Sequence, residues 1–154
     1  MTGRLSFSRL TLASLALSFL VGSAASSATT SDAERDAKAR EYFTNTELVN
    51  QNGERVRFYD DVLKDKVVVI NFIFTNCQGA CPLMTRNLTN IRDMLPESER
   101  DQVHFISISL DPVRDTPAAM KEFAKTHQAD QAGWQFLTGR PENVTFVTKR
   151  LGSY

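Results

Sequence analysis

The chain has 154 residues and balances 18 lysine and arginine side chains against 18 aspartate and glutamate side chains. This balance excludes the basic surface of a nucleic-acid-binding protein, and no acidic tail is present. The length indicates one domain.

The first 28 residues are expected to be an export signal or a membrane anchor. Arg4 and Arg9 precede an uncharged apolar run over 10–21, and the small residues at 22–25 offer cleavage sites. The apolar run is shorter than the roughly 20 residues of a spanning helix, although the uncharged stretch 10–30 would just serve as an anchor.

The next segment, 29–42, is small, polar and charged and has almost nothing to bury. We interpret it as a tether to a domain over 43–154. That domain opens with two short runs, 47–50 and 55–58, on either side of Asn52 and Gly53. An Asn-Gly turn between short alternating runs predicts a hairpin.

Strands and helices are expected to alternate through the rest of the chain. Apolar, largely β-branched or aromatic runs predict strands over 67–74, 103–110 and 134–137. Helices are predicted from Pro82 to before Pro96, from Pro117 behind an N-cap at Thr116, and over 141–151. This order predicts an α/β domain with a parallel or mixed sheet under helices.

Apolar residues at helical spacing predict the buried helix faces. In the first helix they are Met84, Leu88, Ile91 and Leu95. In the second they are Met120, Phe123 and Ala124, and in the third Val144, Val147 and Leu151, with Gly152 past its end.

Cys77 and Cys81 are the only cysteines, and they lie at the junction between the predicted strand 67–74 and the helix after it. Export would place them in an oxidising compartment, where thiols tend to pair. A cross-link between them closes a very small loop and so stabilises the fold little. The pair is therefore expected to serve redox exchange or the binding of a soft metal ion.

Ligands of open α/β sheets bind beyond the carboxyl ends of the strands, where Cys77 and Asp111 should emerge as neighbours. A helix N-terminus favours a thiolate. Because Cys81 directly precedes Pro82, a suitable first helical residue, the sequence predicts Cys81 as the ready thiolate, with Cys77 reaching in from the loop. Their spacing permits a disulfide or two thiolates on one ion, for which monovalent copper is suited.

Further polar candidates lie near the pair or elsewhere in the chain. His104, near the start of its strand, and His127, behind a helix on the far side, are interpreted as ordinary histidines, and Met84 as a core residue. Asp111 and Asp115 flank a Pro-Val-Arg turn. Two roles are open for them, which are turn and cap chemistry, or an acid near the sulfurs that tunes them or pairs with Arg114.

Three motifs resemble those of the Sco/SenC family. In chain order they are FTNCQGACPLM at 74–84, SLDPVRDTP at 109–117 and WQFLTG at 134–139. The resemblance covers roughly residues 43–154 and implies a thioredoxin-like mixed sheet flanked by helices, in an exported or membrane-associated protein that delivers copper to cytochrome c oxidase. It implies Cys77 and Cys81 as the sulfur ligands of copper, with Asp111 close by.

The resemblance also implies two partners, which are the copper-site subunit of the oxidase and a thiol reductant of the thioredoxin type. The family's third copper ligand is a histidine downstream of the tryptophan-containing strand, and the chain ends at Tyr154 before any such loop. We therefore expect the final hairpin and helix of the fold to be missing, which leaves one edge of the sheet unpaired. Either the sequence is a fragment or truncated gene product, or a partner protein covers that edge.

Three alternatives to copper binding are weighed. A thiol-disulfide oxidoreductase would use the same cysteines on a partner's disulfide. A peroxidase of the peroxiredoxin kind is disfavoured, because Thr75 lies two residues before Cys77, where such enzymes have a threonine three residues before the reactive cysteine. The last alternative is an inactive remnant that does not fold stably.

Overall fold

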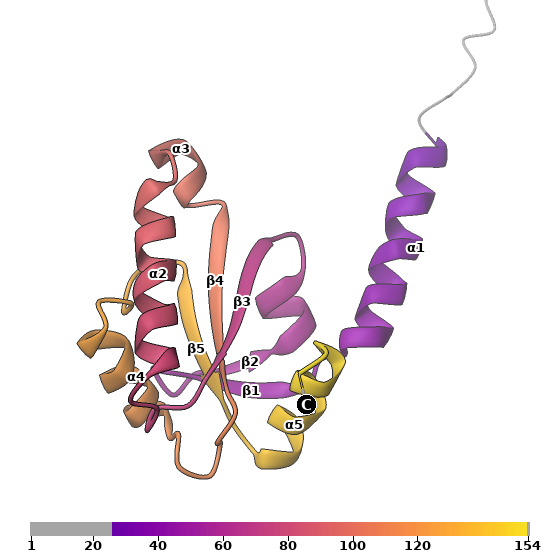
Figure 1. Cartoon of the computed structure of the whole chain (residues 1–154). Coiled ribbons are helices and arrows are strands. Elements are labelled where there is room, and N and C mark those ends of the chain that lie inside the picture. Colours follow the sequence, from indigo (N-terminus) through magenta and orange to yellow (C-terminus); the bar gives the residue numbers. More distant parts are fainter. Residues whose placement is uncertain (1–25, 154) are drawn as a thin grey trace, which may run out of the picture.

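A mixed five-stranded sheet organises residues 26–153, the part of the chain that the computed structural model describes (Figure 1). The strands are β1 (Glu47–Asn50), β2 (Arg55–Arg57), β3 (Val67–Ile73), β4 (Val103–Ser109) and β5 (Trp134–Thr138). The helices are α1 (Ser26–Phe43), the π-helical η1 (Phe58–Leu63), α2 (Ala80–Met94), α3 (Glu97–Arg100), α4 (Pro117–Thr126) and α5 (Pro141–Arg150). The strand order is β2-β1-β5-β4-β3, with β3, β4 and β5 parallel and β1 antiparallel to both neighbours.

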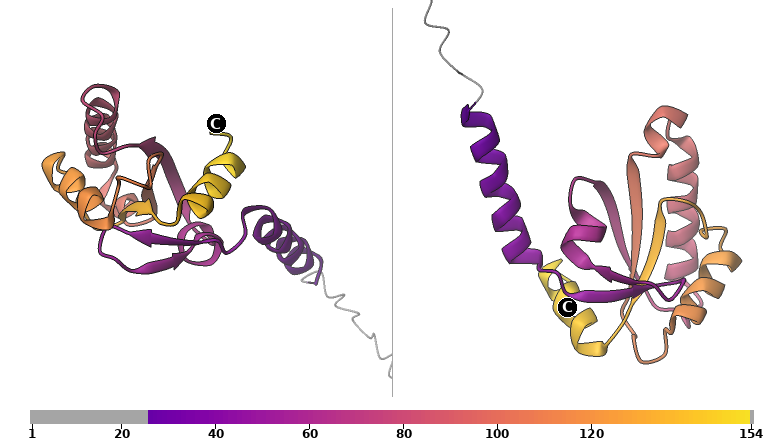
Figure 2. Two further views of the ribbon diagram at one scale, coloured as in Figure 1. Left: turned by 90° about the horizontal axis from the view of Figure 1, so that it is seen from below. Right: turned by 180° about the vertical axis from the view of Figure 1, so that it is seen from behind.

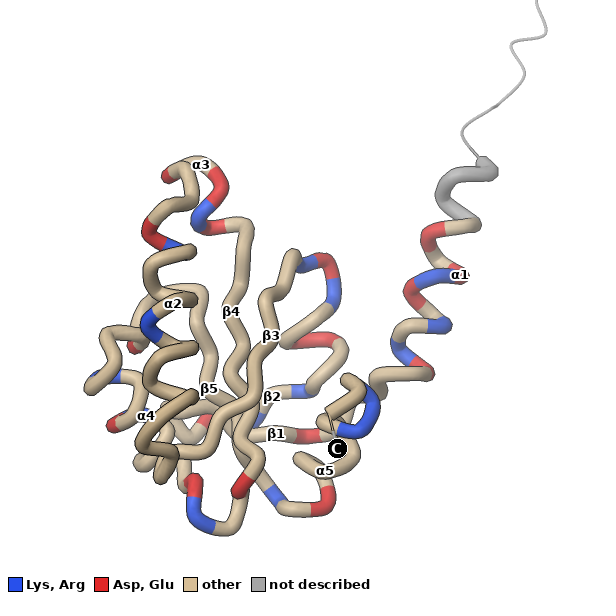
Figure 3. The backbone as a smooth tube through the Cα atoms, in the orientation of Figure 1, with Lys and Arg blue, Asp and Glu red and all other residues tan. Residues whose placement is uncertain are grey.

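The three parallel strands carry no lysine, arginine, aspartate or glutamate, and the charges lie on the helices, the loops and the hairpin β1–β2 (Figure 3). Uncharged strands of this kind fit a sheet that is covered on both faces. Helices α2 and α4 cover one face, and η1 and α5 cover the other (Figures 1 and 2). The predicted α/β class, the hairpin and the three strands are confirmed, but β3 is the edge strand of the sheet and is only partly buried.

Each face of the sheet has its own apolar cluster, because successive strand residues point to opposite faces. The cluster under α2 and α4 contains Ile73, Phe105, Met120, Phe123, Trp134 and Phe136. The cluster under η1 and α5 contains Leu48, Phe58, Ile106, Ile108, Leu137, Val144 and Val147. Packing on both faces fixes the ends of β3 and β4, beyond which the cysteines and aspartates lie.

A series of buried side-chain hydrogen bonds connects the three parallel strands. The Trp134 indole N–H donates to the Ser107 hydroxyl at 2.9 Å, and that hydroxyl donates to the Asn71 side-chain oxygen at 2.7 Å. These residues come from β5, β4 and β3 respectively. Each of these buried groups has a hydrogen-bond partner. The series of hydrogen bonds therefore favours this one pairing of the three strands in an otherwise apolar layer.

The two helices after β4 begin where predicted, and α5 ends one residue before the predicted Leu151. The Thr116 hydroxyl accepts a hydrogen bond from the Ala119 N–H at 3.2 Å, and Pro117 is the first residue of α4. Helix α5 ends just before Gly152, whose φ of +80° is the left-handed conformation typical of a residue after a helix.

The segment predicted as a tether, 29–42, is helical and belongs to α1. It is rich in alanine, glutamate, lysine and arginine, which are strong helix formers, whereas the prediction weighed only its lack of apolar residues. The Tyr59 hydroxyl donates to the Asp36 carboxylate at 2.8 Å, and the Tyr42 hydroxyl donates to the Arg150 carbonyl at 3.1 Å. The C-terminal half of α1 is therefore tied to the domain, while its first half projects away from the sheet (Figures 1 and 2).

Residues 26–153 include no helix with both the length and the apolar character that a membrane span requires. The signal or anchor predicted over residues 1–28 lies almost entirely before residue 26, outside the described residues.

Helix α2 buries only part of the face that the sequence predicts, with Leu88 and Leu95 packed against the core. Its buried residues are Cys81, Thr85 and Thr89. Met84 and Ile91, predicted to be buried, are 44% and 49% exposed. The Thr89 hydroxyl donates to the Thr85 carbonyl at 3.1 Å, which satisfies that hydroxyl within the helix and lets it face the core.

Candidate metal centre

The cysteine pair lies between the end of β3 and the first turn of α2. The helix begins at Ala80 with Gly79 as its N-cap residue, so Cys81 is already the second helical residue. The prediction that Pro82 opens the helix is wrong by two residues. Proline is tolerated throughout the first turn, because the N–H groups there have no intrahelical partner.

The Cys77 sulfur lies over the open N-terminal end of α2. The Cys77 N–H donates to the Phe74 carbonyl at 3.1 Å, which closes a tight turn after β3. The Cys81 N–H donates to the Cys77 sulfur, with an N···S distance of 3.3 Å. Both cysteines are free thiols, Cys77 half-buried and Cys81 buried. One turn of chain thus gathers both cysteines at the helix end.

The surroundings shift the pKa values of the two thiols in opposite directions. The pKa of Cys77 is lowered, first by a hydrogen bond from the Cys81 thiol and then by the backbone N–H groups of Cys81, Gly79 and Ala80. The pKa of Cys81 is raised, first because burial disfavours its thiolate and then because its S–H is engaged with Cys77. The helix N-terminus therefore favours a thiolate at Cys77, whereas the sequence assigned that role to Cys81.

The two aspartates after β4 have different surroundings. Asp111 forms an ion pair with the exposed Arg114 at 2.8 Å. Asp115 is 1% exposed, and its carboxylate accepts hydrogen bonds from the Thr75 N–H at 3.0 Å, the Thr75 hydroxyl at 2.6 Å and the Ser109 hydroxyl at 2.6 Å. The loops after β3 and β4 therefore meet as predicted. The sequence singled out Asp111 for this junction, but the aspartate that bonds to the cysteine loop is Asp115.

His104 and Met84, which the sequence does not predict as ligands, have other surroundings. His104 is the second residue of β4, at the opposite end of the sheet, and burial lowers its pKa. Met84 is exposed, and its sulfur accepts a weak hydrogen bond from the Asn71 side chain at 3.8 Å. Among residues 26–153, no three His, Cys, Asp or Glu side chains are placed to hold one metal ion. In that range, the two sulfurs of Cys77 and Cys81 are the donor atoms that lie together at the end of α2.

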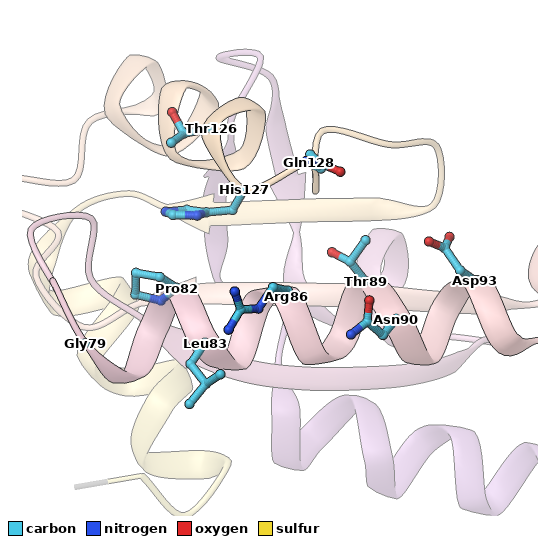
Figure 4. A pocket seen from close by; sticks show the side chains of 10 residues that line it. All are labelled: Gly79, Pro82, Leu83, Arg86, Thr89, Asn90, Asp93, Thr126, His127 and Gln128. Atoms are coloured by element: carbon cyan, nitrogen blue, oxygen red, sulfur yellow. The ribbon is translucent and has the colours of Figure 1, made fainter.

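A groove of about 570 Å³ runs along α2 from the cysteine loop toward the C-terminal end of α4 (Figure 4). Its lining residues are Gly79, Pro82, Leu83, Arg86, Thr89, Asn90, Asp93, Thr126, His127 and Gln128. The sequence placed His127 on the far side of the molecule, but it faces this groove, and its ring packs on Phe123 with 4.4 Å between centroids. The signal for this contact is the position of His127 directly after α4. A segment of another protein in the groove would lie beside the cysteine loop.

The chain matches the family model SCO1/SenC over residues 31–154. The SCO1 protein homolog of Bacillus subtilis is 40% identical over 90 residues, which are 58% of this chain and 45% of that protein. The chain spans about half the length of the curated relatives it matches.

Solved structures agree with this match. Bradyrhizobium japonicum ScoI with copper bound is similar with a TM-score of 0.62 and 31% identity, over 71% of this chain and 66% of that one. BsSco, a member of the Sco family of cytochrome c oxidase assembly proteins in which a disulfide switch was identified, has a TM-score of 0.59 and 35% identity, over 70% of this chain and 62% of that one. The predicted thioredoxin-like fold is confirmed. With its three motifs, its mixed sheet and the family model in agreement, the chain belongs to the SCO1/SenC family.

Proposed function

We propose that this chain binds copper(I) through Cys77 and Cys81 and passes it to, or matures, the copper site of cytochrome c oxidase. The observation that carries the proposal is the contact between the Cys81 N–H and the Cys77 sulfur, which gathers two free thiols at one helix end. The copper-bound structure of B. japonicum ScoI supports copper as the ion. The description of BsSco as belonging to a family of oxidase assembly proteins supports the target.

The chemistry of the two donors fits monovalent copper. Thiolates are soft ligands, and Cu(I) accepts a low-coordinate arrangement that two sulfurs can supply. Structural zinc ordinarily requires four protein ligands, which the described residues do not offer at this site. Binding releases the thiol protons, so affinity should rise with pH, and Cys77 with its lowered pKa should lose its proton first. Cu(II), which prefers harder nitrogen and oxygen donors, should bind much more weakly.

A Cu(I) competition titration tests this function. The reduced chain, mixed with a chromophoric Cu(I) chelator, is expected to withdraw one copper per chain. A sample oxidised to the Cys77–Cys81 disulfide is the control, because it has no thiolate to offer, and it should withdraw none. Equal withdrawal by both samples, or none by the reduced chain, contradicts the proposal.

A second candidate function, thiol-disulfide exchange with a partner, is favoured by the asymmetry of the two thiols. The Cys77 thiolate would attack a disulfide of the partner, form a mixed disulfide and expel one partner thiolate. The Cys81 thiol would lose its proton and attack the Cys77 sulfur, which closes the Cys77–Cys81 disulfide and releases the second partner thiol. Two electrons thus pass to the partner, and a reductant of the thioredoxin type would restore the pair.

Trapping distinguishes this function from copper binding alone. Cys81→Ser keeps the attacking thiol and removes the resolving one, so it should accumulate a mixed disulfide with a model substrate that contains a single disulfide. Cys77→Ser is the matched control and should trap little, because the remaining thiol is buried and has a raised pKa. Equal trapping by the two variants, measured by mass under non-reducing conditions, argues against an ordered exchange.

The cellular setting belongs to the same proposal. The charge and hydropathy pattern of residues 1–28 supports export, with the domain free in the periplasm or held at the outer face of the inner membrane. There the chain would meet the copper-site subunit of the oxidase and a thiol reductant. An oxidising compartment also makes a reductant necessary, since the thiol pair must be reduced before it can bind Cu(I).

A further inference from the structure

Asp115 is a buried carboxylate held by neutral donors alone. Its three hydrogen bonds come from the Thr75 N–H, the Thr75 hydroxyl and the Ser109 hydroxyl, and no ion pair to it occurs among residues 26–153. A charge in the interior is costly unless hydrogen bonds satisfy it. Both oxygens of Asp115 are used in this way, so the site depends on all three donors staying in place.

The bonds join the two loops that follow β3 and β4. Thr75 lies in the turn that the Cys77 N–H closes on the Phe74 carbonyl. Ser109 is the last residue of β4, and its hydroxyl also accepts the Asp111 N–H at 3.0 Å. The carboxylate of Asp115 therefore fixes the cysteine loop against the end of a central strand.

The contact between Cys77 and α2 depends on two parts of the molecule, the helix and the turn that carries Cys77, and different residues fix each of them. On one side, Cys81, Thr85 and Thr89 anchor α2 in the core. On the other side, the turn that carries Cys77 is bonded through Thr75 to Asp115. The 3.3 Å contact between the Cys81 N–H and the Cys77 sulfur requires both. Asp111 is not placed for this role, because its carboxylate pairs with Arg114 and makes no bond to the cysteine loop among the described residues.

We propose that Asp115 is the positioning residue that holds the Phe74–Cys77 turn, and with it the Cys77 sulfur, against the N-terminal N–H groups of α2. Asp115 acts through Thr75 and touches neither sulfur nor copper. The proposal concerns the same pair of sulfurs as the proposed function, but alkylation of Cys77 does not require copper, so the two can fail separately.

The test is Asp115→Asn, which keeps the volume and removes the charge. Its amide has one uncharged acceptor oxygen where the carboxylate has two charged ones, so it cannot accept from Thr75 and Ser109 together and the turn should loosen. We expect the alkylation rate of Cys77 by iodoacetamide at pH 7 to fall by about fivefold or more, and the Cu(I) affinity to fall by about tenfold, comparable to the loss of an outer-shell partner of a metal ligand. Asp130→Asn removes the same charge at an exposed position paired with Lys121 and should change neither quantity.

A purely structural role predicts a different outcome. If Asp115→Asn unfolds cooperatively in urea, and so is folded beforehand, but alkylates and binds copper like the unmodified chain, the proposal is overturned. Should this variant not fold, Thr75→Val and Thr75→Ser decide. Thr75→Val removes the hydroxyl donor and should slow the alkylation of Cys77. Thr75→Ser keeps that donor and should alkylate at the rate of the unmodified chain. Equal alkylation rates in the two variants overturn the proposal. If even the unmodified chain binds no copper, the proposed function fails while the alkylation result still decides the role of Asp115.

Discussion

Replacing both cysteines with serine, Cys77→Ser with Cys81→Ser, is expected to lower the Cu(I) affinity of the reduced chain by about 10⁴-fold or more. Loss of an outer-shell partner of a metal ligand already costs roughly 10- to 100-fold, so each lost sulfur ligand should exceed that range. A serine hydroxyl is a hard, protonated donor and does not replace a thiolate on Cu(I). The measurement is a competition titration against chelators of graded affinity.

The single variants and one control sharpen this result. Each single serine variant should lose a large part of the affinity, because a lone sulfur cannot complete even a two-coordinate site. Met84→Leu removes the exposed thioether three residues after Cys81 and should leave the affinity unchanged, since its sulfur is bonded to Asn71. An unchanged affinity in the double serine variant, or a comparable loss in Met84→Leu, means that copper is held elsewhere.

Iodoacetamide at pH 7 is expected to modify Cys77 at least about tenfold faster than Cys81. The reagent reacts with the thiolate, and the pKa of Cys77 is lowered while that of Cys81 is raised. The rate of Cys77 should therefore reach half its plateau below the ordinary cysteine pKa, and that of Cys81 above it. Burial of Cys81 slows its reaction further. The lower intrinsic nucleophilicity of an acidic thiolate offsets only part of this difference.

Mass spectrometry of the unmodified chain across a pH series, with fragmentation that resolves Cys77 from Cys81, gives the two profiles while keeping the contact between the thiols. In 8 M urea the profiles should converge, because both the helix N-terminus and the burial are lost, and this is the internal control. Coincident profiles in the folded chain, or a faster Cys81, contradict the assignment of the acidic thiol to Cys77.

The elements that local chemistry specifies could be predicted from the sequence. Apolar β-branched runs located β3 and β4, and a threonine before a proline located the start of α4. The buried face of α2 could not be read in this way. The apolar periodicity indicated Met84 and Ile91, but Thr85 and Thr89 are the buried residues, and the Thr89 hydroxyl is satisfied by a hydrogen bond inside the helix.

The placement of both cysteines at one strand-to-helix junction could be predicted from the sequence, but the order of their acidities could not. A cysteine pair at a strand-to-helix junction is visible in the sequence, whereas the first residue of α2 is not, because proline fits several positions of a first turn. A start at Ala80 makes the Cys81 N–H a donor to Cys77, and this reverses the expected order of acidity. In the same way, two aspartates four residues apart look equivalent, and only the fold separates the buried Asp115 from the exposed ion pair of Asp111.

Helix α1 sets a length scale for the molecule. Its 18 residues at 1.5 Å each make a rod of about 27 Å, stiff compared with a coil of the same number of residues. In a chain held at its N-terminal end, the length of α1 would therefore set the distance between the point of attachment and the two sulfurs. The hydrogen bonds of Asp36 and Tyr42 would restrict rotation of the domain relative to α1. Such a spacer restricts the volume in which the two sulfurs can move. It would raise the rate at which they meet a partner site about one helix length from the point of attachment, and lower the rate for sites closer to that point.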